Sequence, residues 1–201
     1  MNKYLKWIIC FIFLSIFIFL GILVLTKKDI YIDSIVYNFI SKYISNGLTN
    51  IYKILTNIAS VLTVILVVIF TFIFFKNKKY SIYMSLNIFL ITLFQFILKA
   101  IFSRTRPIDI NLIEETGYSY PSGHSLTAMA LYGFIIYLIY TSNLNKRSKL
   151  IYITFFSCLI FVVGLSRIYL GVHFFTDVVG AFSFALSYLI IYISIIKNKL
   201  T

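Results

Sequence analysis

Long apolar runs alternate along the chain with short polar segments that hold most of its charged residues. A helix needs about 20 apolar residues to cross the ~30 Å hydrocarbon layer of a bilayer. Six runs approach or reach that length, at about 7–25, 54–75, 81–102, 124–140, 150–165 and 172–196. Because lipid cannot satisfy the open edge of a β-sheet, the pattern predicts an all-α, polytopic membrane protein, a six-transmembrane-helix bundle.

The composition supports this interpretation. Charged residues make up 12% of the 201 residues and the mean hydropathy is +0.97, whereas a soluble domain carries about 25% charged residues. No stretch is left for a separate soluble domain, so we expect residues 1–201 to form a single membrane-embedded domain. A cleaved signal peptide is the alternative for the first run, but that run is long and no small-x-small cleavage site precedes Thr26.

The segment 26–53 is the longest connection between predicted spans, and its apolar side chains are interleaved with polar ones. Two structures fit this pattern equally well. One is an amphipathic helix that lies along the membrane surface. The other is a partly buried loop that packs on the bundle.

The charge pattern predicts an orientation. Ten cations and no acid lie on one side of the six predicted spans. The positive-inside rule makes that side cytoplasmic, so we expect a multi-pass protein of the cytoplasmic membrane with both termini inside the cell. The six acids then lie outside or in the outer part of a span; they are Asp29, Asp33, Asp109, Glu114, Glu115 and Asp177. Because the basic residues are scattered over short loops, no nucleic-acid partner is expected.

Three further cations, Lys99, Arg106 and Arg167, fall at the outer face, where few acids are available to neutralise them. An ionisable side chain within a span costs about 2.5–3.5 kcal/mol on insertion scales and marks a functional site by default. Arginine forks bind phosphate oxygens in a bidentate manner, and lysine acts as a point charge. The cluster therefore predicts an anion-binding site. Nothing in the spacing of Arg104 distinguishes it from a loop arginine.

His173 and Asp177 are four residues apart, so on a helix they share one face. The carboxylate would hold one ring nitrogen protonated and leave the other free as a nucleophile or base. The alternative is a buried histidine satisfied by a neighbouring carboxylate, without chemistry.

The stretch GYSYPSGHSL, residues 117–126, precedes the fourth predicted span. Ser122 can cap that helix, and the free N–H groups at a helix N-terminus bind anions. Gly123 lets the backbone approach a phosphate closely, and His124 would point into the same pocket as a proton donor. Taken alone, the stretch fits a simple N-cap and turn equally well.

Together these segments form three motifs: K-x6-RP from Lys99 to Pro107, PSGH from Pro121 to His124, and SR-x5-H-x3-D from Ser166 to Asp177. Their order and spacing resemble the type 2 phosphatidic acid phosphatase superfamily, the lipid phosphate phosphatases. Within it, the chain looks most similar to bacterial undecaprenyl pyrophosphate and phosphatidylglycerophosphate phosphatases.

The resemblance implies a role for each motif residue. His173 would attack phosphorus, Asp177 would orient it, and His124 would protonate the leaving oxygen. The phosphoryl oxygens would be held by Lys99, Arg106, Ser122, Gly123 and Arg167. Pro107, Pro121 and Ser166 would support the site. No metal or other cofactor is expected, and Cys10 and Cys158, both within apolar runs, are expected to be buried free thiols.

The resemblance thus implies a membrane lipid phosphatase acting on a phosphomonoester or pyrophosphate, with undecaprenyl pyrophosphate favoured. Phosphatidylglycerophosphate, phosphatidic acid and lipid A phosphate remain alternatives, and no obligate protein partner is evident. An intramembrane serine hydrolase using Ser122 with His173 is a second class, although it has no use for clustered cations. A non-enzymatic anionic-lipid binding or transport protein is a third.

Overall fold

The computed structural model describes residues 3–26, 30–107 and 110–200, and these contain helices but no strand. The prediction of an all-α membrane fold is therefore confirmed for the described part of the chain. The helices are α1 (Lys3–Leu25), α2 (Tyr31–Ser41), α3 (Asn46–Thr56), the 3-10 turn η1 (Asn57–Ala59), α4 (Val61–Phe74), α5 (Lys78–Phe102), α6 (Gly123–Thr141), α7 (Lys146–Tyr169) and α8 (Phe175–Leu200).

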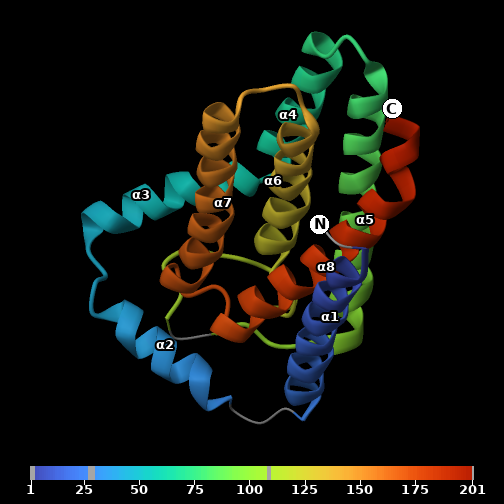
Figure 1. The fold of residues 1–201 in the computed structure, drawn as a ribbon. Coiled ribbons are helices and arrows are strands. Elements are labelled where there is room, and N and C mark those ends of the chain that lie inside the picture. The colour runs from blue at the N-terminus through green and yellow to red at the C-terminus, as the bar shows by residue number, and fades with distance from the viewer. Residues whose placement is uncertain (1–2, 27–29, 108–109, 201) are drawn as a thin grey trace.

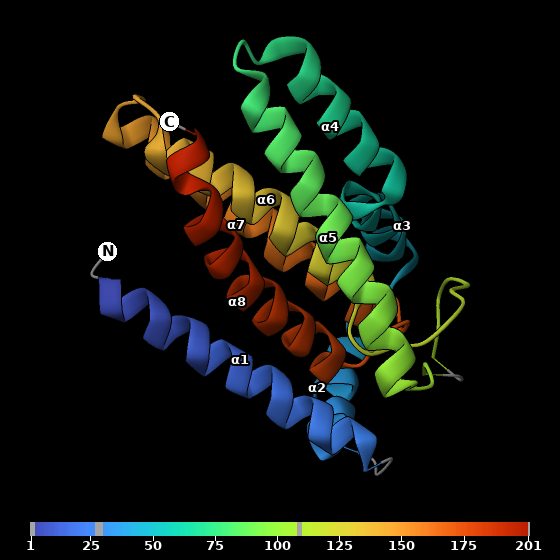
Figure 2. The ribbon, with the colours of Figure 1, turned by 90° about the vertical axis from the view of Figure 1, so that its right-hand side faces the viewer.

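Helix α6 lies inside the bundle, packed against α5, α7 and α8, while α1 covers α8 (Figures 1 and 2). The small and apolar side chains of α6 explain why it lies inside the bundle, because Ala128, Leu131 and Phe134 are fully buried against neighbouring helices. In contrast, α4 presents large apolar side chains such as Ile65 and Ile73 outward. A helix that is apolar on its outer face is suited to lipid contact.

Five helices of the described chain are long and apolar enough to cross a membrane, and the count reaches the predicted six if one bent pair of helices is taken as a single span. That pair differs from the continuous run expected at 54–75. Residues 46–59 and α4 meet at an angle of 47°, because Ser60 has an extended backbone and its hydroxyl accepts a hydrogen bond from Thr63 N, which starts a new helix.

The other boundaries also shift. Helix α7 runs from Lys146 to Tyr169 rather than over 150–165, because its polar ends are helical too. The last helix begins at Phe175, not at 172, because Gly171 has a φ of +69° and forms a turn. A side chain at Gly171 would place its Cβ 2.0 Å from Ile110 O, so only glycine fits there.

The segment 26–53 contains α2 and most of α3, so the loop alternative is wrong for its described part. Helix α2 packs against α7 and α8 at one end of the bundle (Figure 1). It exposes apolar side chains such as Tyr31, Ile35 and Phe39 and buries Asp33, which is 5% exposed. Helix α2 is therefore amphipathic, as predicted, but its buried face carries the carboxylate of Asp33.

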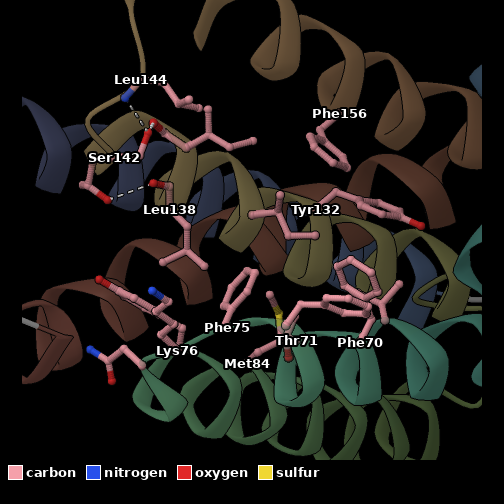
Figure 3. A pocket seen from close by; sticks show the side chains of 17 residues that line it. Phe70, Thr71, Phe75, Lys76, Met84, Tyr132, Leu138, Ser142, Leu144 and Phe156 are labelled. Carbon is pink, nitrogen blue, oxygen red and sulfur yellow. Dashed lines mark hydrogen bonds between the residues drawn. The ribbon is translucent and has the colours of Figure 1, made fainter. Parts of the chain in front are cut away.

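An apolar cavity of about 770 Å³ lies between α4, α5, α6 and α7, lined among others by Phe70, Met84, Tyr132 and Phe156 (Figure 3). It involves the C-terminal half of α6 and not the end that carries the PSGH motif. Of the two cysteines, Cys10 is buried as expected, whereas Cys158 is exposed on the outer side of α7. The prediction of a buried Cys158 is wrong because an apolar helix in this bundle also has an outward face.

Candidate active site

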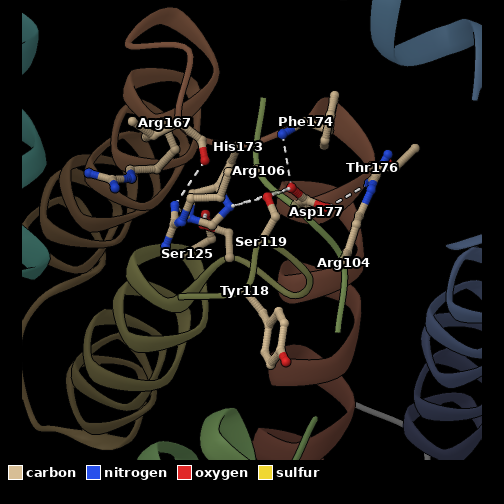
Figure 4. A network of polar contacts seen from close by, with 12 residues as sticks. Arg104, Arg106, Tyr118, Ser119, Ser125, Arg167, His173, Phe174, Thr176 and Asp177 are labelled. Atoms are coloured by element: carbon tan, nitrogen blue, oxygen red, sulfur yellow. Dashed lines mark hydrogen bonds and ion pairs between the residues drawn. The ribbon is translucent and has the colours of Figure 1, made fainter. Parts of the chain in front are cut away.

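The three motifs meet at one end of the bundle, where α5 and α7 end and where α6 and α8 begin (Figures 1 and 4). The loop 103–122 between α5 and α6 crosses this end. It is tied to the α7–α8 turn by a hydrogen bond from Leu112 N to Leu170 O (2.9 Å), and to α8 by one from Ser122 N to Asp177 O (3.2 Å).

His173 and Asp177 are in contact, with His173 Nδ1 3.4 Å from Asp177 Oδ2. The pairing is as predicted, but its local structure is not, because His173 lies in the turn before α8. Asp177 is in the first turn of α8, and its Oδ2 accepts a hydrogen bond from Phe174 N (2.9 Å). A carboxylate that reaches back to cap its own helix in this way is held firmly.

Ser119 is a third member of this group, and nothing in its sequence context selects it. Its hydroxyl donates to Asp177 Oδ2 (2.5 Å) and lies 3.2 Å from His173 Nδ1. The side chain is fully buried. Ser119 therefore shares the space between the imidazole and the carboxylate, and only its position next to both could have revealed it.

Arg106 determines which ring nitrogen of His173 is free. Its Nη1 lies 3.2 Å from His173 Nε2, and a guanidinium has donors only. Nε2 must therefore be the acceptor, so the proton of a neutral ring is on Nδ1, facing Asp177 and Ser119. The lone pair of Nε2 points toward the cations, as a nucleophile for phosphorus requires.

Burial lowers the pKa of His173 to about 3, although the hydrogen bond and the charge of Asp177 oppose this shift. His173 is 3% exposed, so solvent cannot stabilise the charged form of its ring. His173 is therefore neutral at neutral pH and its lone pair is available.

Arg167 is the most deeply buried cation of the site, at 1% exposure. Its Nη1 donates to Thr56 Oγ1 (2.7 Å) and its Nη2 to Glu115 Oε1 (2.5 Å). Its Nε is buried and has no hydrogen-bond partner. An unpaired buried donor is costly, and a bound anion would satisfy it.

Glu115 is a second residue that the sequence did not single out as part of the site. Besides its contact with Arg167, its Oε2 lies 3.9 Å from Arg106 Nη2. Although burial raises the pKa of Glu115, the charge and hydrogen bond of Arg167 outweigh it and lower that pKa below its ordinary value. The cation cluster is thus partly neutralised by a carboxylate from the loop.

Lys99 and Arg106 bind carbonyl oxygens of the same loop, and Arg106 also binds one in the turn between α7 and α8. Lys99 Nζ donates to Tyr118 O (2.5 Å), while Arg106 donates to Gly117 O from Nε (3.0 Å), to Thr116 O from Nη2 (3.1 Å) and to Val172 O from Nη1 (2.9 Å). The positive φ of Gly117, +76°, allows the turn that presents these carbonyls.

The PSGH motif opens α6 as expected, with Ser122 at the N-cap position. The capping prediction is wrong, however, because the Ser122 side chain makes no cap hydrogen bond and instead accepts one from Ser125 Oγ (3.0 Å). Gly123 has a packing reason beside the predicted one, since a Cβ there would lie 2.8 Å from the Gln95 amide. His124 is the second residue of α6. It interacts electrostatically with Arg167, Glu115, Arg106 and Lys99.

Arg104, which its spacing did not distinguish, is a central residue. Its Nη1 lies 2.6 Å from Asp177 Oδ1 and its Nη2 2.8 Å from Asp33 Oδ2. It also lies over the Phe174 ring, at 4.0 Å from the centroid. The sequence could not have found this link because Asp33 is in α2, far from the three motifs.

The model of the PAP2 superfamily matches residues 80–200 of the chain. The chain belongs to the PAP2 superfamily. Phosphatidylglycerophosphatase B of Bacillus subtilis is 37% identical over 131 residues, which are 64% of this chain and 64% of that relative. The chain therefore spans less than two thirds of that relative's length.

Two solved structures show that the similarity extends to the fold. The first transmembrane PAP2 type phosphatidylglycerolphosphate phosphatase from Bacillus subtilis superposes with a TM-score of 0.81 at 25% identity, covering 92% of this chain and 96% of that chain. LpxE of Aquifex aeolicus gives a TM-score of 0.66 at 24% identity, covering 86% and 98%. The family indicated by the three motifs is thus confirmed.

The supporting residues of this PAP2 chain are buried but differ in what they do. Pro107 and Pro121 lie in the loop 103–122. The Ser166 hydroxyl donates to Val163 O (2.6 Å) in its own helix, so it supports the site through the α7 backbone. In the part of the chain that the structure describes, no three His, Cys, Asp or Glu side chains are grouped as a metal site would need.

Proposed function

We propose that this PAP2 protein is an integral membrane phosphatase that hydrolyses a lipid phosphomonoester or pyrophosphate through a phosphohistidine on His173. The observation that carries the proposal is the arrangement around His173 Nε2. Its lone pair faces Arg106 Nη1 at 3.2 Å, and the nearby buried Arg167 has an Nε–H without a partner. A phosphoryl group placed there would be open to attack by His173 Nε2, and its oxygens would accept a hydrogen bond from the unpaired Arg167 Nε–H.

In the first step, Nε2 attacks phosphorus while the bond from phosphorus to the leaving oxygen breaks, and His124 donates a proton to that oxygen. Asp177 and Ser119 stabilise the positive charge that develops on the ring. Lys99, Arg106, Arg167, Ser122 and the Gly123 amide hold the phosphoryl oxygens, as suits a reaction in which positioning and electrostatics dominate. In the second step, water attacks phosphorus, His124 takes its proton, the P–N bond breaks and inorganic phosphate leaves.

The similarity to a Bacillus subtilis relative and to a Bacillus subtilis solved structure, both described as phosphatidylglycerophosphate phosphatases, supports phosphatidylglycerophosphate as the first substrate to test. Undecaprenyl pyrophosphate, the substrate favoured from the sequence, stays a prediction. Both present a terminal phosphate on a lipid, so the same site chemistry serves either.

We further propose that the site faces the extracytoplasmic side of the cytoplasmic membrane, with both termini inside. The basic loops support this orientation. Of the acids invoked, Asp29 and Asp109 lie outside the described residues, whereas Asp33, Glu115 and Asp177 lie at the end of the bundle that carries the site.

The test is phosphate release in detergent without divalent metal, with phosphatidylglycerophosphate, undecaprenyl pyrophosphate and phosphatidic acid offered in parallel. We expect release by the wild type and none by His173→Gln, with the ranking of rates identifying the substrate. Folded protein that releases phosphate from none of these lipids would overturn the proposal in favour of a binding or transport role.

A further inference from the structure

Helix α2 lies outside the matched family region, residues 80–200, yet its only acid is bound to the catalytic end of the bundle. Asp33 is 5% exposed, although α2 otherwise presents apolar side chains outward. A buried carboxylate is costly unless it is fully paired. The groups that pair with the Asp33 carboxylate therefore indicate its role.

Three donors converge on Asp33. Oδ1 accepts from Thr176 N (2.8 Å), and Oδ2 accepts from both Thr176 Oγ1 and Arg104 Nη2 (2.8 Å each). Thr176 immediately precedes Asp177. Asp33 thus holds the first turn of α8 directly and holds the Arg104 side chain at the same time.

Arg104 carries the contact onward to Asp177. One end of its guanidinium is fixed by Asp33, and its Nη1 donates to Asp177 Oδ1 (2.6 Å) and to Thr176 Oγ1 (2.8 Å). The plane of a carboxylate is held only weakly by its own torsion, which is broad. Arg104 fixes Oδ1, and together with the Phe174 N–H, which binds Oδ2, it keeps Oδ2 near Ser119 and His173 Nδ1 (Figure 4).

We propose, on the basis of the proposed function, that Asp33 and Arg104 are positioning residues that fix the Asp177 carboxylate and thereby the tautomer and orientation of His173. No hydrogen bond or ion pair links either side chain to Lys99, Arg106 or Arg167, so neither belongs to the phosphate-binding set within the described residues. Helix α2 is then a working part of the catalytic end and not only a surface segment.

The first experiment does not depend on turnover. The chain has two histidines, so ¹⁵N-histidine labelling gives two imidazoles, and His124→Gln assigns the signals of His173. We expect a single Nδ1–H tautomer in the wild type. In Asp33→Asn, which keeps the shape of the side chain but removes its charge, the His173 shifts should move toward a mixture of tautomers.

The second experiment measures kcat and KM for phosphate release. Misplacement of a catalytic group by about 1 Å costs on the order of 100-fold in rate, so we expect kcat to fall about 10- to 100-fold in Asp33→Asn and in Arg104→Lys, with KM within about twofold of wild type. The matched control is Ser34→Ala, because the exposed Ser34 hydroxyl donates only to Tyr31 O in its own helix (2.8 Å).

His173 shifts that remain at wild-type values in both Asp33→Asn and Arg104→Lys would overturn the inference. So would altered shifts with an unchanged kcat in an active enzyme. If the wild type releases no phosphate, the proposed function fails, and the ¹⁵N shifts alone decide whether the link from Asp33 to His173 exists. A Ser34→Ala variant that behaves like Asp33→Asn would also contradict it, since the effect would then belong to α2 in general.

Discussion

Arg106 donates a hydrogen bond to the lone pair of His173 Nε2: Arg106 Nη1 lies 3.2 Å from this nitrogen. Because a guanidinium cannot accept a hydrogen bond, this contact leaves Nε2 unprotonated and aims it at the place where Arg106 and Arg167 can hold a phosphoryl group. The same side chain therefore selects the tautomer and, in the proposed function, would also bind the phosphoryl group.

This relationship predicts that Arg106→Lys is not a conservative change. Lysine keeps the charge but loses the fork that bonds two loop carbonyls and Nε2 together. We expect kcat/KM for phosphate release to fall about 100-fold, as is typical when a preorganised donor to the transition state is lost. A rate within threefold of wild type would show that charge alone suffices.

Glu115 acts as the internal counter-ion of Arg167, so Glu115→Gln should destabilise the protein. Removing one partner of a buried pair costs 3–5 kcal/mol, and since Glu115 is 27% exposed we expect about 2–3 kcal/mol. Inorganic phosphate should then raise the Tm of the variant more than that of the wild type, because an anion can replace the carboxylate.

Glu114→Gln provides the control for this experiment, since Glu114 is an exposed neighbour in the same loop. Its Tm and its response to phosphate should match the wild type. An equal response to phosphate in Glu115→Gln and in the wild type would mean that the carboxylate does not occupy the phosphate position.

The lowered pKa of His173 predicts a dependence of stability on pH. The folded state keeps His173 neutral down to about pH 3, whereas an unfolded histidine binds a proton below about pH 6.5. Between these values the unfolded state holds more protons, so stability falls as the pH falls. At pH 5 the loss relative to pH 8 should be about 2 kcal/mol from this group.

Chemical denaturation of wild type and His173→Asn at both pH values measures this contribution. The variant should lose about 2 kcal/mol less than the wild type, whatever the other carboxyl groups contribute to both proteins. Parallel pH profiles for the two proteins would show that His173 is not held neutral by burial.

Ser122→Ala separates the phosphatase from a serine hydrolase. The Ser122 hydroxyl accepts a hydrogen bond from Ser125, and the serine that lies beside His173 is Ser119. We therefore expect the Ser122→Ala variant to lose one hydrogen bond to phosphate and about tenfold in kcat/KM. Loss of all activity, together with labelling of the wild type by a fluorophosphonate, would instead identify Ser122 as the nucleophile.

The proposed orientation predicts opposite labelling of two loops. In a chain with Cys10 and Cys158 replaced by serine, Asn143→Cys should react with an impermeant maleimide only after the cell membrane is opened. Glu114→Cys, at the other end of the bundle, should react in intact cells. The reverse pattern would place the site on the cytoplasmic side of the membrane.

The sequence by itself determined the helical membrane fold, because apolar run length reflects the thickness of the bilayer and not the details of packing. It also predicted the proposed catalytic pair and the cations beside it, since His173, Asp177 and the residues around Lys99 and Ser122 stand in local motifs whose spacing can be recognised along the chain. The break at Ser60 was missed because isolated polar residues such as Asn57 and Ser60, within an otherwise apolar run, do not by themselves mark the end of a helix.

Only the tertiary structure decided which polar side chains complete the site. Asp33 contacts Thr176, 143 residues away, and Ser119 and Glu115 reach their partners across a loop that carries no periodic pattern. Such contacts follow from how helices and loops fold over one another, and the sequence around each residue looks the same whether the contact forms or not. The identity of Arg104 as a bridge, rather than a loop arginine, is decided by the two carboxylates that the fold brings to it.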